Sequence, residues 1–181
     1  QAASNYEGRG QRVLLAKPEI DTKGADQIDS RLGVKRPVDF LVGPADELRE
    51  VFHTAAGHAP VACLLVDEAQ FLTPAQVDDL LRIAVLDGIP VLAYGIRTDF
   101  RTEAFPGSAR LLELAHSLEE LKTICRCGPQ AIFNARPVGG RFVFDGDQVA
   151  LDEERDAGEV TYESMCAACY LQASGGRLDG N

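Results

Sequence analysis

The stretch Val61-Ala-Cys-Leu-Leu-Val-Asp-Glu-Ala-Gln-Phe-Leu-Thr73 decides the fold of this chain. Its first six residues, up to Val66, are apolar and rich in branched side chains, which is typical of a strand buried on both faces of a parallel sheet. Two carboxylates, Asp67 and Glu68, follow where such a strand leaves the core. Ligands of open α/β sheets bind at the carboxyl ends of the strands, and carboxylates there can hold Mg²⁺ directly or through water. The junction is therefore a candidate nucleotide-phosphate site; the alternative is that the two acids merely begin a solvated loop.

Apolar strands and amphipathic helices alternate around this stretch, which predicts an α/β fold with a parallel sheet and crossover helices. The other predicted strands are Arg12–Ala16, a possible edge strand at Val38–Val42, and a buried strand at Ile89–Tyr94. Three helices are predicted. The first covers residues 45–56 and ends at Gly57, and the third covers residues 108–115. The second begins at the capping box Thr73-Pro-Ala-Gln76 and ends at Gly88, and its apolar face consists of Val77, Leu80, Leu81 and Ala84.

The cysteines form two close pairs, Cys125-Arg-Cys127 and Cys166-Ala-Ala-Cys169. Pairs at these spacings, separated by a short β-rich region, predict a structural Zn²⁺ site of the ribbon type, because two tight turns can bring four thiolates together. The alternative is four unrelated buried thiols. Cys63 lies inside the central strand and is expected to be a small core residue.

Three regions follow from these patterns: an α/β core at 1–124, a zinc-binding lobe at 125–172 and a disordered tail at 173–181. Within the lobe, the candidate strands are Ala131–Ala135, Arg141–Phe144 and Gln148–Leu151.

Length and charge narrow the range of partners. A chain of 181 residues and 19.5 kDa fits one domain with a small appendage. A formal charge of −10 argues against a nucleic-acid binder, which needs a basic face to meet phosphates, and favours small molecules or protein surfaces. No stretch approaches the ~20 apolar residues that span a bilayer, and no basic-then-apolar leader opens the chain, so we expect a cytoplasmic protein without a membrane partner.

Several blocks together resemble the type II, or cytosolic, thymidine kinase family: Asp67-Glu-Ala-Gln-Phe71, Gly95-Ile-Arg-Thr-Asp-Phe100, the paired cysteines, and the spacing from Tyr162 to Cys166. The resemblance implies a P-loop, RecA-like core that transfers the ATP γ-phosphoryl group to the 5′-hydroxyl of thymidine or deoxyuridine in nucleoside salvage. It also implies Mg²⁺ and Zn²⁺ as cofactors and a homotetramer as the assembly.

The resemblance also assigns roles to individual residues. Glu68 would be the general base, since a carboxylate within hydrogen-bond reach can accept the proton of the attacking hydroxyl. The remaining assignments are as follows: Asp67, Glu68, Ala69, Gln70, Asp21 and Lys23 at ATP and Mg²⁺; Phe71, Ile96, Phe100, Phe105 and Tyr162 around thymidine; and Cys125, Cys127, Cys166 and Cys169 at Zn²⁺. The bland alternatives are core packing for Phe71, Ile96 and Phe105, a turn role for Asp21, and packing on the zinc lobe for Tyr162; Phe100, in a polar loop, is expected to meet ligand.

Two departures from the family pattern bear on these expectations. The family begins with a strand and a glycine-rich phosphate loop ending Gly-Lys-Ser/Thr, and this sequence has no such motif. We expect the natural protein to carry about twenty more residues before Gln1, and the chain as given to bind ATP poorly and to be weakly active or inactive. The segment Leu151–Gly158 is longer and more acidic than the family's substrate loop at that place.

Two other function classes fit parts of the sequence. One is a P-loop ATPase of another class, which uses ATP to drive motion. Such a motor should contact a polymer or a protein at the place where this chain has an aromatic loop, and the negative net charge disfavours nucleic acid as that polymer. The other is a non-catalytic zinc-ribbon interaction module, which the missing phosphate loop favours and the intact Asp67-Glu68 pair opposes.

Overall fold

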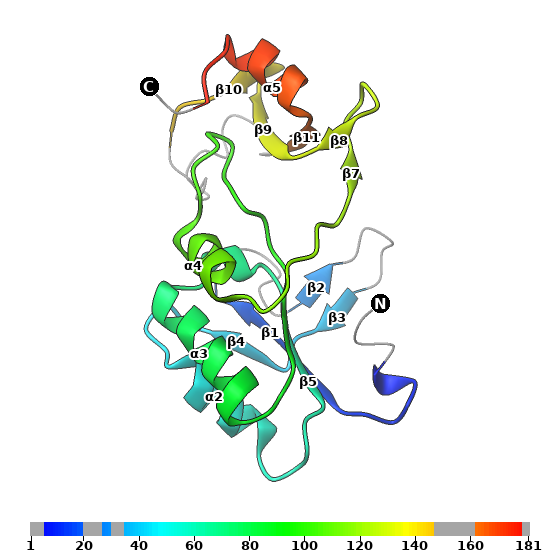
Figure 1. The fold of residues 1–181 in the computed structure, drawn as a ribbon, viewed down its shortest axis with the longest axis vertical. Helices are drawn as coiled ribbons and strands as arrows, with labels where there is room; N and C mark the ends of the chain where they lie inside the picture. The colour runs from blue at the N-terminus through cyan, green and yellow to red at the C-terminus, as the bar shows by residue number, and fades with distance from the viewer. Residues whose placement is uncertain (1–5, 20–26, 30–34, 147–161, 179–181) are drawn as a thin grey trace. The chain divides into compact units, whose positions relative to one another are not determined.

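The computed structural model describes residues 6–19, 27–29, 35–146 and 162–178 (Figure 1). The chain divides into two compact units. Unit 1 comprises residues 1–96 and 106–116, and unit 2 comprises residues 97–105 and 117–181. The sequence analysis put the boundary between the α/β core and the zinc-binding lobe at residue 124, so it assigned residues 97–105 to the core.

Unit 1 is built on a parallel sheet in the order β4-β1-β5-β6. Its strands are β1 (Val13–Pro18), β4 (Phe40–Val42), β5 (Cys63–Val66) and β6 (Val91–Ala93). The predicted α/β class and the edge position of the strand near residue 40 are confirmed. The expectation that the strand at Ile89–Tyr94 is buried is wrong. This strand, β6, lies at the other edge of the described sheet, and its three residues are half-buried or exposed.

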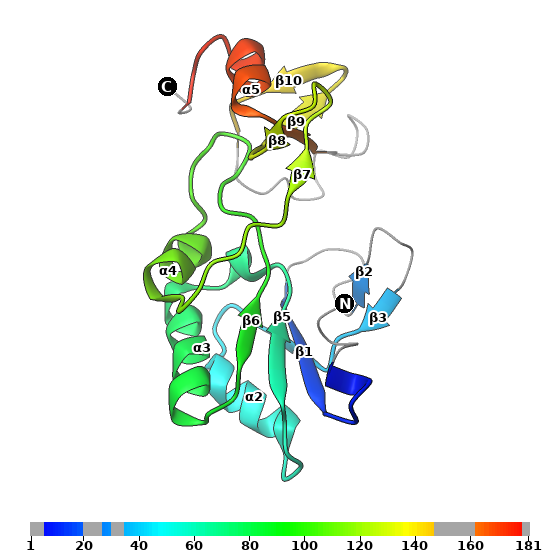
Figure 2. The same cartoon turned by 45° about the vertical axis from the view of Figure 1, so that its right-hand side comes forward.

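The alternating side chains of β1 and β5 supply the cores on the two faces of the sheet. Leu14 and Leu64 pack in one core with residues of α2 (Leu48–Ala56), α3 (Pro74–Leu86) and α4 (Pro106–Leu114). Figure 2 shows these three helices on one side of the sheet. On the opposite face Val13, Leu15, Cys63 and Leu65 pack with Tyr6, Leu92 and Tyr94. Burial on both faces explains why β5 reads as an unbroken apolar run.

Helix α3 begins with the predicted capping box. The Thr73 hydroxyl accepts a hydrogen bond from the Gln76 backbone N–H at 3.2 Å, and the Gln76 side-chain oxygen accepts one from the Thr73 N–H at 3.0 Å. The Gln76 amide also donates to the carbonyls of Gly43 and Asp46, so this buried side chain ties the end of β4 to α3. Two residues of the apolar face predicted for α3, Val77 and Leu80, are buried, whereas Leu81 and Ala84 are only half-buried. Ile83 is fully buried but was not part of the predicted face.

One pair of strands in unit 1 was not predicted, whereas the end of helix α2 was. An antiparallel pair, β2 (Gln27–Asp29) and β3 (Lys35–Pro37), lies in the region the sequence left unassigned. Helix α2 ends at Gly57, as predicted, with a positive φ of 58°. Within the described part of the chain, no helix is both long and apolar enough to cross a bilayer.

Unit 2 contains a hairpin and a three-stranded antiparallel sheet in the order β10-β9-β11. The hairpin consists of β7 (Thr123–Ile124) and β8 (Gln130–Ala131); the sheet consists of β9 (Phe133–Val138), β10 (Arg141–Val143) and β11 (Glu163–Met165). A small core of Ala135, Phe144, Met165 and Tyr170 holds the sheet to helix α5 (Ala167–Ser174).

The sequence predicted β9 and β10 but missed β11 and α5. The predicted strand Gln148–Leu151 lies outside the described residues. Ordered structure continues past residue 173, where disorder was predicted, because α5 runs to Ser174 and the Ser174 hydroxyl donates to the Arg177 carbonyl at 2.7 Å. Residues 179–181 lie outside the described part of the chain.

Candidate active site and metal centre

The acidic loop of unit 1 begins where β5 ends between β1 and β6. The Asp67 N–H donates to the Ala16 carbonyl at 3.0 Å, and the Tyr94 N–H donates to the Val66 carbonyl at 2.8 Å. The backbone of Glu68 then turns into the left-handed region, with φ 51° and ψ 36°. This conformation is uncommon for a residue with a side chain, and such strain is found preferentially at functional sites.

Gln70 fixes the carboxylate of Glu68. The Gln70 side chain is 2% exposed; its amide nitrogen donates to Glu68 Oε2 at 2.5 Å, and its oxygen accepts from the Ile96 N–H at 3.3 Å. Gln70 thus joins the single 3₁₀ turn η1 (Ala69–Phe71) to the segment that follows β6. The sequence assigned Gln70 to the ATP and Mg²⁺ contacts, which stays a prediction; in the structure its amide is hydrogen-bonded to Glu68.

Two glycines allow the segments around Gln70 to approach one another closely. A Cβ at Gly95 would lie 2.6 Å from the Gln70 side-chain oxygen. A Cβ at Gly107, in the first turn of α4, would lie 2.9 Å from the Ala69 carbonyl oxygen and closer still to that of Leu72. The Ser108 hydroxyl donates to the Ile96 carbonyl at 2.6 Å and holds the same helix end. The sequence pattern predicted no role for Gly95 or Gly107.

The predicted site residues are divided between the two units. Asp67, Glu68, Ala69, Gln70, Phe71 and Ile96 come together in unit 1, where Phe71 is half-buried and Ile96 is 41% exposed. Phe100, Phe105 and Tyr162 belong to unit 2. Asp21 and Lys23 lie outside the described residues.

The loop Arg97–Phe105 is a compact turn organised around Asp99. The Asp99 carboxylate is almost fully buried and accepts hydrogen bonds from the backbone N–H groups of Arg101 at 2.8 Å and Glu103 at 3.0 Å. Thr98 and Ala104 form a β-bridge across the loop. The loop is therefore closed on itself by contacts between its own residues.

Phe100 is buried within unit 2. Its ring is 1% exposed and lies under the guanidinium of Arg136, 4.2 Å from the ring centroid. The Phe100 carbonyl accepts a 2.6 Å hydrogen bond from the hydroxyl of Tyr170. Burial and the nearby charge of Asp99 raise the pKa of Tyr170 above its ordinary value. The sequence expected the Phe100 ring to meet ligand; here Arg136 covers it. Tyr162, by contrast, is 51% exposed.

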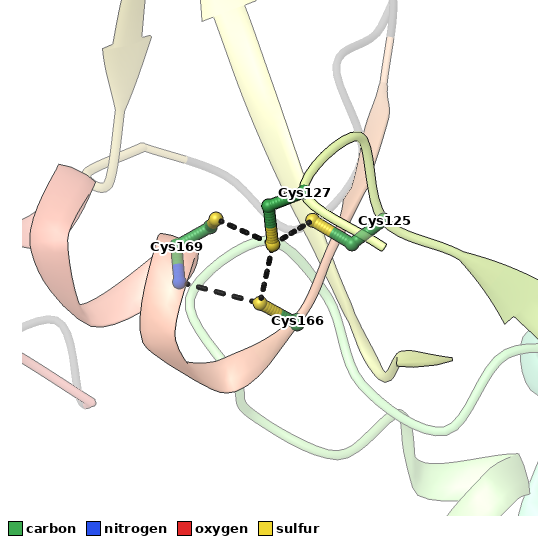
Figure 3. A group of neighbouring side chains, drawn as sticks. All are labelled: Cys125, Cys127, Cys166 and Cys169. Atoms are coloured by element: carbon green, nitrogen blue, oxygen red, sulfur yellow. Dashed lines mark hydrogen bonds between the residues drawn. The ribbon is translucent and has the colours of Figure 1, made fainter. Parts of the chain in front are cut away.

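The four paired cysteines converge in unit 2 as predicted (Figure 3). Their sulfurs all lie within 4.8 Å of one another. The Cys127 sulfur lies 3.6 Å from that of Cys125, 3.5 Å from that of Cys166 and 3.4 Å from that of Cys169. Cys125 and Cys127 come from the turn between β7 and β8, and Cys166 and Cys169 from the start of α5. Four convergent thiol ligands are a donor set that Zn²⁺ takes in structural sites, so the residues fit that ion.

The protonation of the cluster depends on its own hydrogen bonds. Backbone N–H groups of Cys127 and Cys166 lower the pKa of the Cys125 thiol to about 6. The neighbouring thiols, chiefly Cys169, raise the pKa of Cys127 to about 12. One sulfur is thus readily available as a thiolate before any cation binds. Cys63 stands apart in β5, where it is fully buried and burial raises its pKa, as expected of a core residue.

Comparison with known proteins gives a consistent result. The sequence profile of the family described as "Thymidine kinase" matches residues 1–170. A thymidine kinase of Ruegeria pomeroyi is 41% identical over 177 residues, which is 97% of this chain and 86% of the relative. One from Chromobacterium violaceum is 42% identical, covering 94% of this chain and 88% of the relative, and one from Enterobacteria phage T4 is 40% identical, covering 91% and 83%.

Proposed function

The chain belongs to the thymidine kinase family, and from this membership we propose that it transfers the γ-phosphoryl group of ATP to the 5′-hydroxyl of thymidine. The product, dTMP, would serve nucleoside salvage for DNA synthesis. The acidic loop at the end of β5 carries the proposal, because the backbone of Glu68 is strained there and its carboxylate is held by the buried amide of Gln70.

Glu68 is the proposed general base. In phosphoryl transfer the protein contributes mainly positioning and charge stabilisation, and a carboxylate at the attacking hydroxyl accepts its proton. Gln70 fixes the direction of the Glu68 carboxylate through one hydrogen bond and is itself fixed by the Ile96 N–H. The base is therefore oriented before substrate binds.

Asp67, with the neighbouring backbone of Ala69, is proposed to serve the ATP phosphates and Mg²⁺, which neutralises phosphate charge when bound. Asp21 and Lys23 remain proposed as contacts near the phosphoryl donor. We further propose that the core is of the P-loop, RecA-like type, as the family resemblance implies.

The proposed thymidine contacts are Phe71 and Ile96 from unit 1 and Phe100, Phe105 and Tyr162 from unit 2. The exposed positions of Ile96 and Tyr162 support their roles, since a side chain that is open to solvent in the free protein can pack on a ligand. The buried Phe100 would act through the loop that it anchors. Deoxyuridine is a second proposed acceptor.

Zn²⁺ is the proposed structural ion, held by Cys125, Cys127, Cys166 and Cys169. A tetrahedral thiolate site fixes two turns and adds folding free energy to a lobe with a small core. The proposed assembly is a homotetramer and the proposed compartment the cytoplasm; both follow from the family. We keep the division into a nucleotide-binding core at 1–124, a zinc-binding lobe at 125–172 and a tail at 173–181 as a proposal about function. It differs in its bounds from the two compact units of the structure.

The test is steady-state thymidine phosphorylation by the full-length protein and its Glu68→Gln variant. Loss of the base should lower kcat about 10²-fold or more and leave KM for ATP within a factor of about three. The matched control is Glu47→Gln, an exposed glutamate just before α2. Activity above a tenth of wild type in Glu68→Gln would contradict the role of Glu68, and absence of thymidine phosphorylation in the wild type would contradict the function.

A further inference from the structure

We propose that Tyr170 is the positioning residue that fixes the Arg97–Phe105 loop to the cysteine cluster, so that metal occupancy and thymidine affinity are coupled. The inference rests on the proposed function in one respect, namely that this loop contributes to the thymidine site. The physical link between the loop and the cluster stands on the structure alone.

The link is one buried hydrogen bond between segments far apart in the sequence. The Tyr170 hydroxyl donates to the Phe100 carbonyl at 2.6 Å, across a sequence separation of 70 residues. Tyr170 is 1% exposed, and its ring packs against Phe133 and Phe144 with centroid distances of 4.9 and 5.3 Å. The phenol is held by its ring, so its hydroxyl has a fixed place. A buried carbonyl that lost this donor would be left unsatisfied.

Tyr170 is also joined to the cysteines through a single helical turn. Cys166 is the N-cap of α5, and its sulfur accepts a hydrogen bond from the Cys169 N–H at 3.5 Å. The Tyr170 N–H donates to the Cys166 carbonyl at 3.0 Å. A cation that holds Cys166 and Cys169 therefore fixes the turn from which the phenol extends.

The loop transmits this fixation because it is internally closed. Asp99 ties the backbone of the loop through the N–H groups of Arg101 and Glu103, so a constraint at Phe100 orients the whole loop. Arg136, from β9, covers the Phe100 ring and adds a cation–π contact. The Tyr170 hydrogen bond is directional and is made to the backbone of the loop itself, so we assign the position of the loop to Tyr170.

The kinetic test compares the full-length protein with Tyr170→Phe, which removes one oxygen and keeps the ring. We expect KM for thymidine to rise about 10-fold, with kcat and KM for ATP within about two-fold of wild type, because one hydrogen bond to the loop is lost. A parallel change in all three constants would show a general structural effect and would overturn the proposal. An unchanged KM for thymidine would overturn it as well.

The physical test needs no substrate. Amide hydrogen exchange of the peptide covering residues 97–105 should become about 10-fold faster in metal-loaded Tyr170→Phe, while exchange in β9 stays as in wild type. Removal of the metal from the wild type with a chelator should speed exchange in the same peptide. Unchanged exchange of residues 97–105 in both experiments would overturn the link.

Two controls separate the possible failures. Phe142→Leu alters the same lobe without touching the hydroxyl, and it should lower stability without raising KM for thymidine. Tyr6→Phe removes a phenol hydroxyl from unit 1 and should leave the 97–105 peptide unchanged. If Tyr170→Phe speeds exchange but the wild type phosphorylates no thymidine, the proposed function fails and the link is upheld.

Discussion

Gly95 is the residue on which the position of the Gln70 amide depends. The backbone of Gly95 passes so close to Gln70 that a single methyl group would meet the side-chain oxygen at 2.6 Å. Gln70 in turn holds Glu68, so a change at Gly95 reaches the proposed base through one side chain. Sequence pattern alone gives no sign of this contact, because it joins the ends of two different strands.

Gly95→Ala should lower kcat about 10-fold or more, because the methyl group displaces Gln70 and a displacement of about 1 Å at a catalytic group is costly. The free energy of unfolding should fall as well, by about 1–3 kcal/mol, because the displaced Gln70 amide is buried and loses its hydrogen bonds. Steady-state kinetics and thermal unfolding of the same preparation check both statements. Ala93→Ser, two residues earlier with an exposed side chain, is the control. A fully active Gly95→Ala would show that the Gln70 amide does not set the geometry.

At the scale of elements, the start of α3 shows how a local motif gains a tertiary role. The capping box Thr73–Gln76 was read from the sequence alone, since it needs only residues three apart. The same Gln76 side chain also reaches the carbonyls of Gly43 and Asp46 at 2.8 and 3.1 Å, which fastens α3 to the loop after β4. Only the folded chain brings these partners together.

Thr73→Ala should cost about 1 kcal/mol of unfolding free energy through loss of the N-cap, and Thr73→Ser should stay close to wild type. Gln76→Leu should cost more, about 2–3 kcal/mol, because the buried Gly43 carbonyl and the part-buried Asp46 carbonyl lose their donor. Urea denaturation of the three variants checks the order. Equal losses for Thr73→Ala and Gln76→Leu would mean that the tertiary bonds of Gln76 contribute nothing.

A second fastening joins the last turn of α3 to α2 and makes stability depend on pH. Arg49 donates to both carboxylate oxygens of Asp87, at 3.0 and 2.7 Å, and His53 lies 3.3 Å from Asp87. These hydrogen bonds hold the pKa of Asp87 below its ordinary value. A carboxyl whose pKa is lowered by folding stabilises the protein above its unfolded pKa of about 3.9. The contribution disappears as the pH falls through the lower, folded value.

Asp87→Asn should therefore lower stability at pH 7 and have a progressively smaller effect below about pH 4. Urea unfolding of wild type and variant at a series of pH values measures the difference. Glu50→Gln, an exposed change on α2, should show no such trend. A difference that stays constant from pH 7 down to pH 3 would be inconsistent with an ionised Asp87 as the partner of Arg49.

At the scale of the molecule, two units with separate cores should respond differently to metal removal. Unit 1 has a large apolar core around β1 and β5, whereas unit 2 has a small core beside the cysteine cluster. A small lobe of this kind depends on its metal for folding free energy. Unit 1 does not contain the cluster.

Chelation should make four of the five thiols reactive, namely those of Cys125, Cys127, Cys166 and Cys169, and leave Cys63 protected until unit 1 unfolds. Thiol titration before and after chelator, with hydrogen exchange to locate the change, measures this directly. A Cys63→Ala variant should retain one metal ion per chain and lose only the fifth, late-reacting thiol. Equal protection of all five thiols after chelation would refute metal-dependent folding of the lobe.

Local pattern carried a large part of this result. The apolar run from Val61 to Val66 predicted a central parallel strand, and the cysteine pairs predicted a converging cluster; the structure has both. The roles assigned to Asp67 and Glu68 stay predictions. These features could be predicted because strand burial, helix capping and paired turns are written in residues close together in the sequence. The family could be recognised from the sequence for the same reason.

The tertiary structure alone decided how these parts act on one another. In the fold the Gln70 side chain is hydrogen-bonded both to the Glu68 carboxylate and to the Ile96 N–H. The Arg97–Phe105 loop belongs to the second unit, and the Tyr170 hydroxyl is joined to the Phe100 carbonyl across 70 residues. It also put the second cysteine pair at the start of α5, a helix that the sequence did not predict and that runs to Ser174, into the tail expected at 173–181. Such contacts arise from the packing of distant segments, and no periodicity or spacing within either segment specifies them.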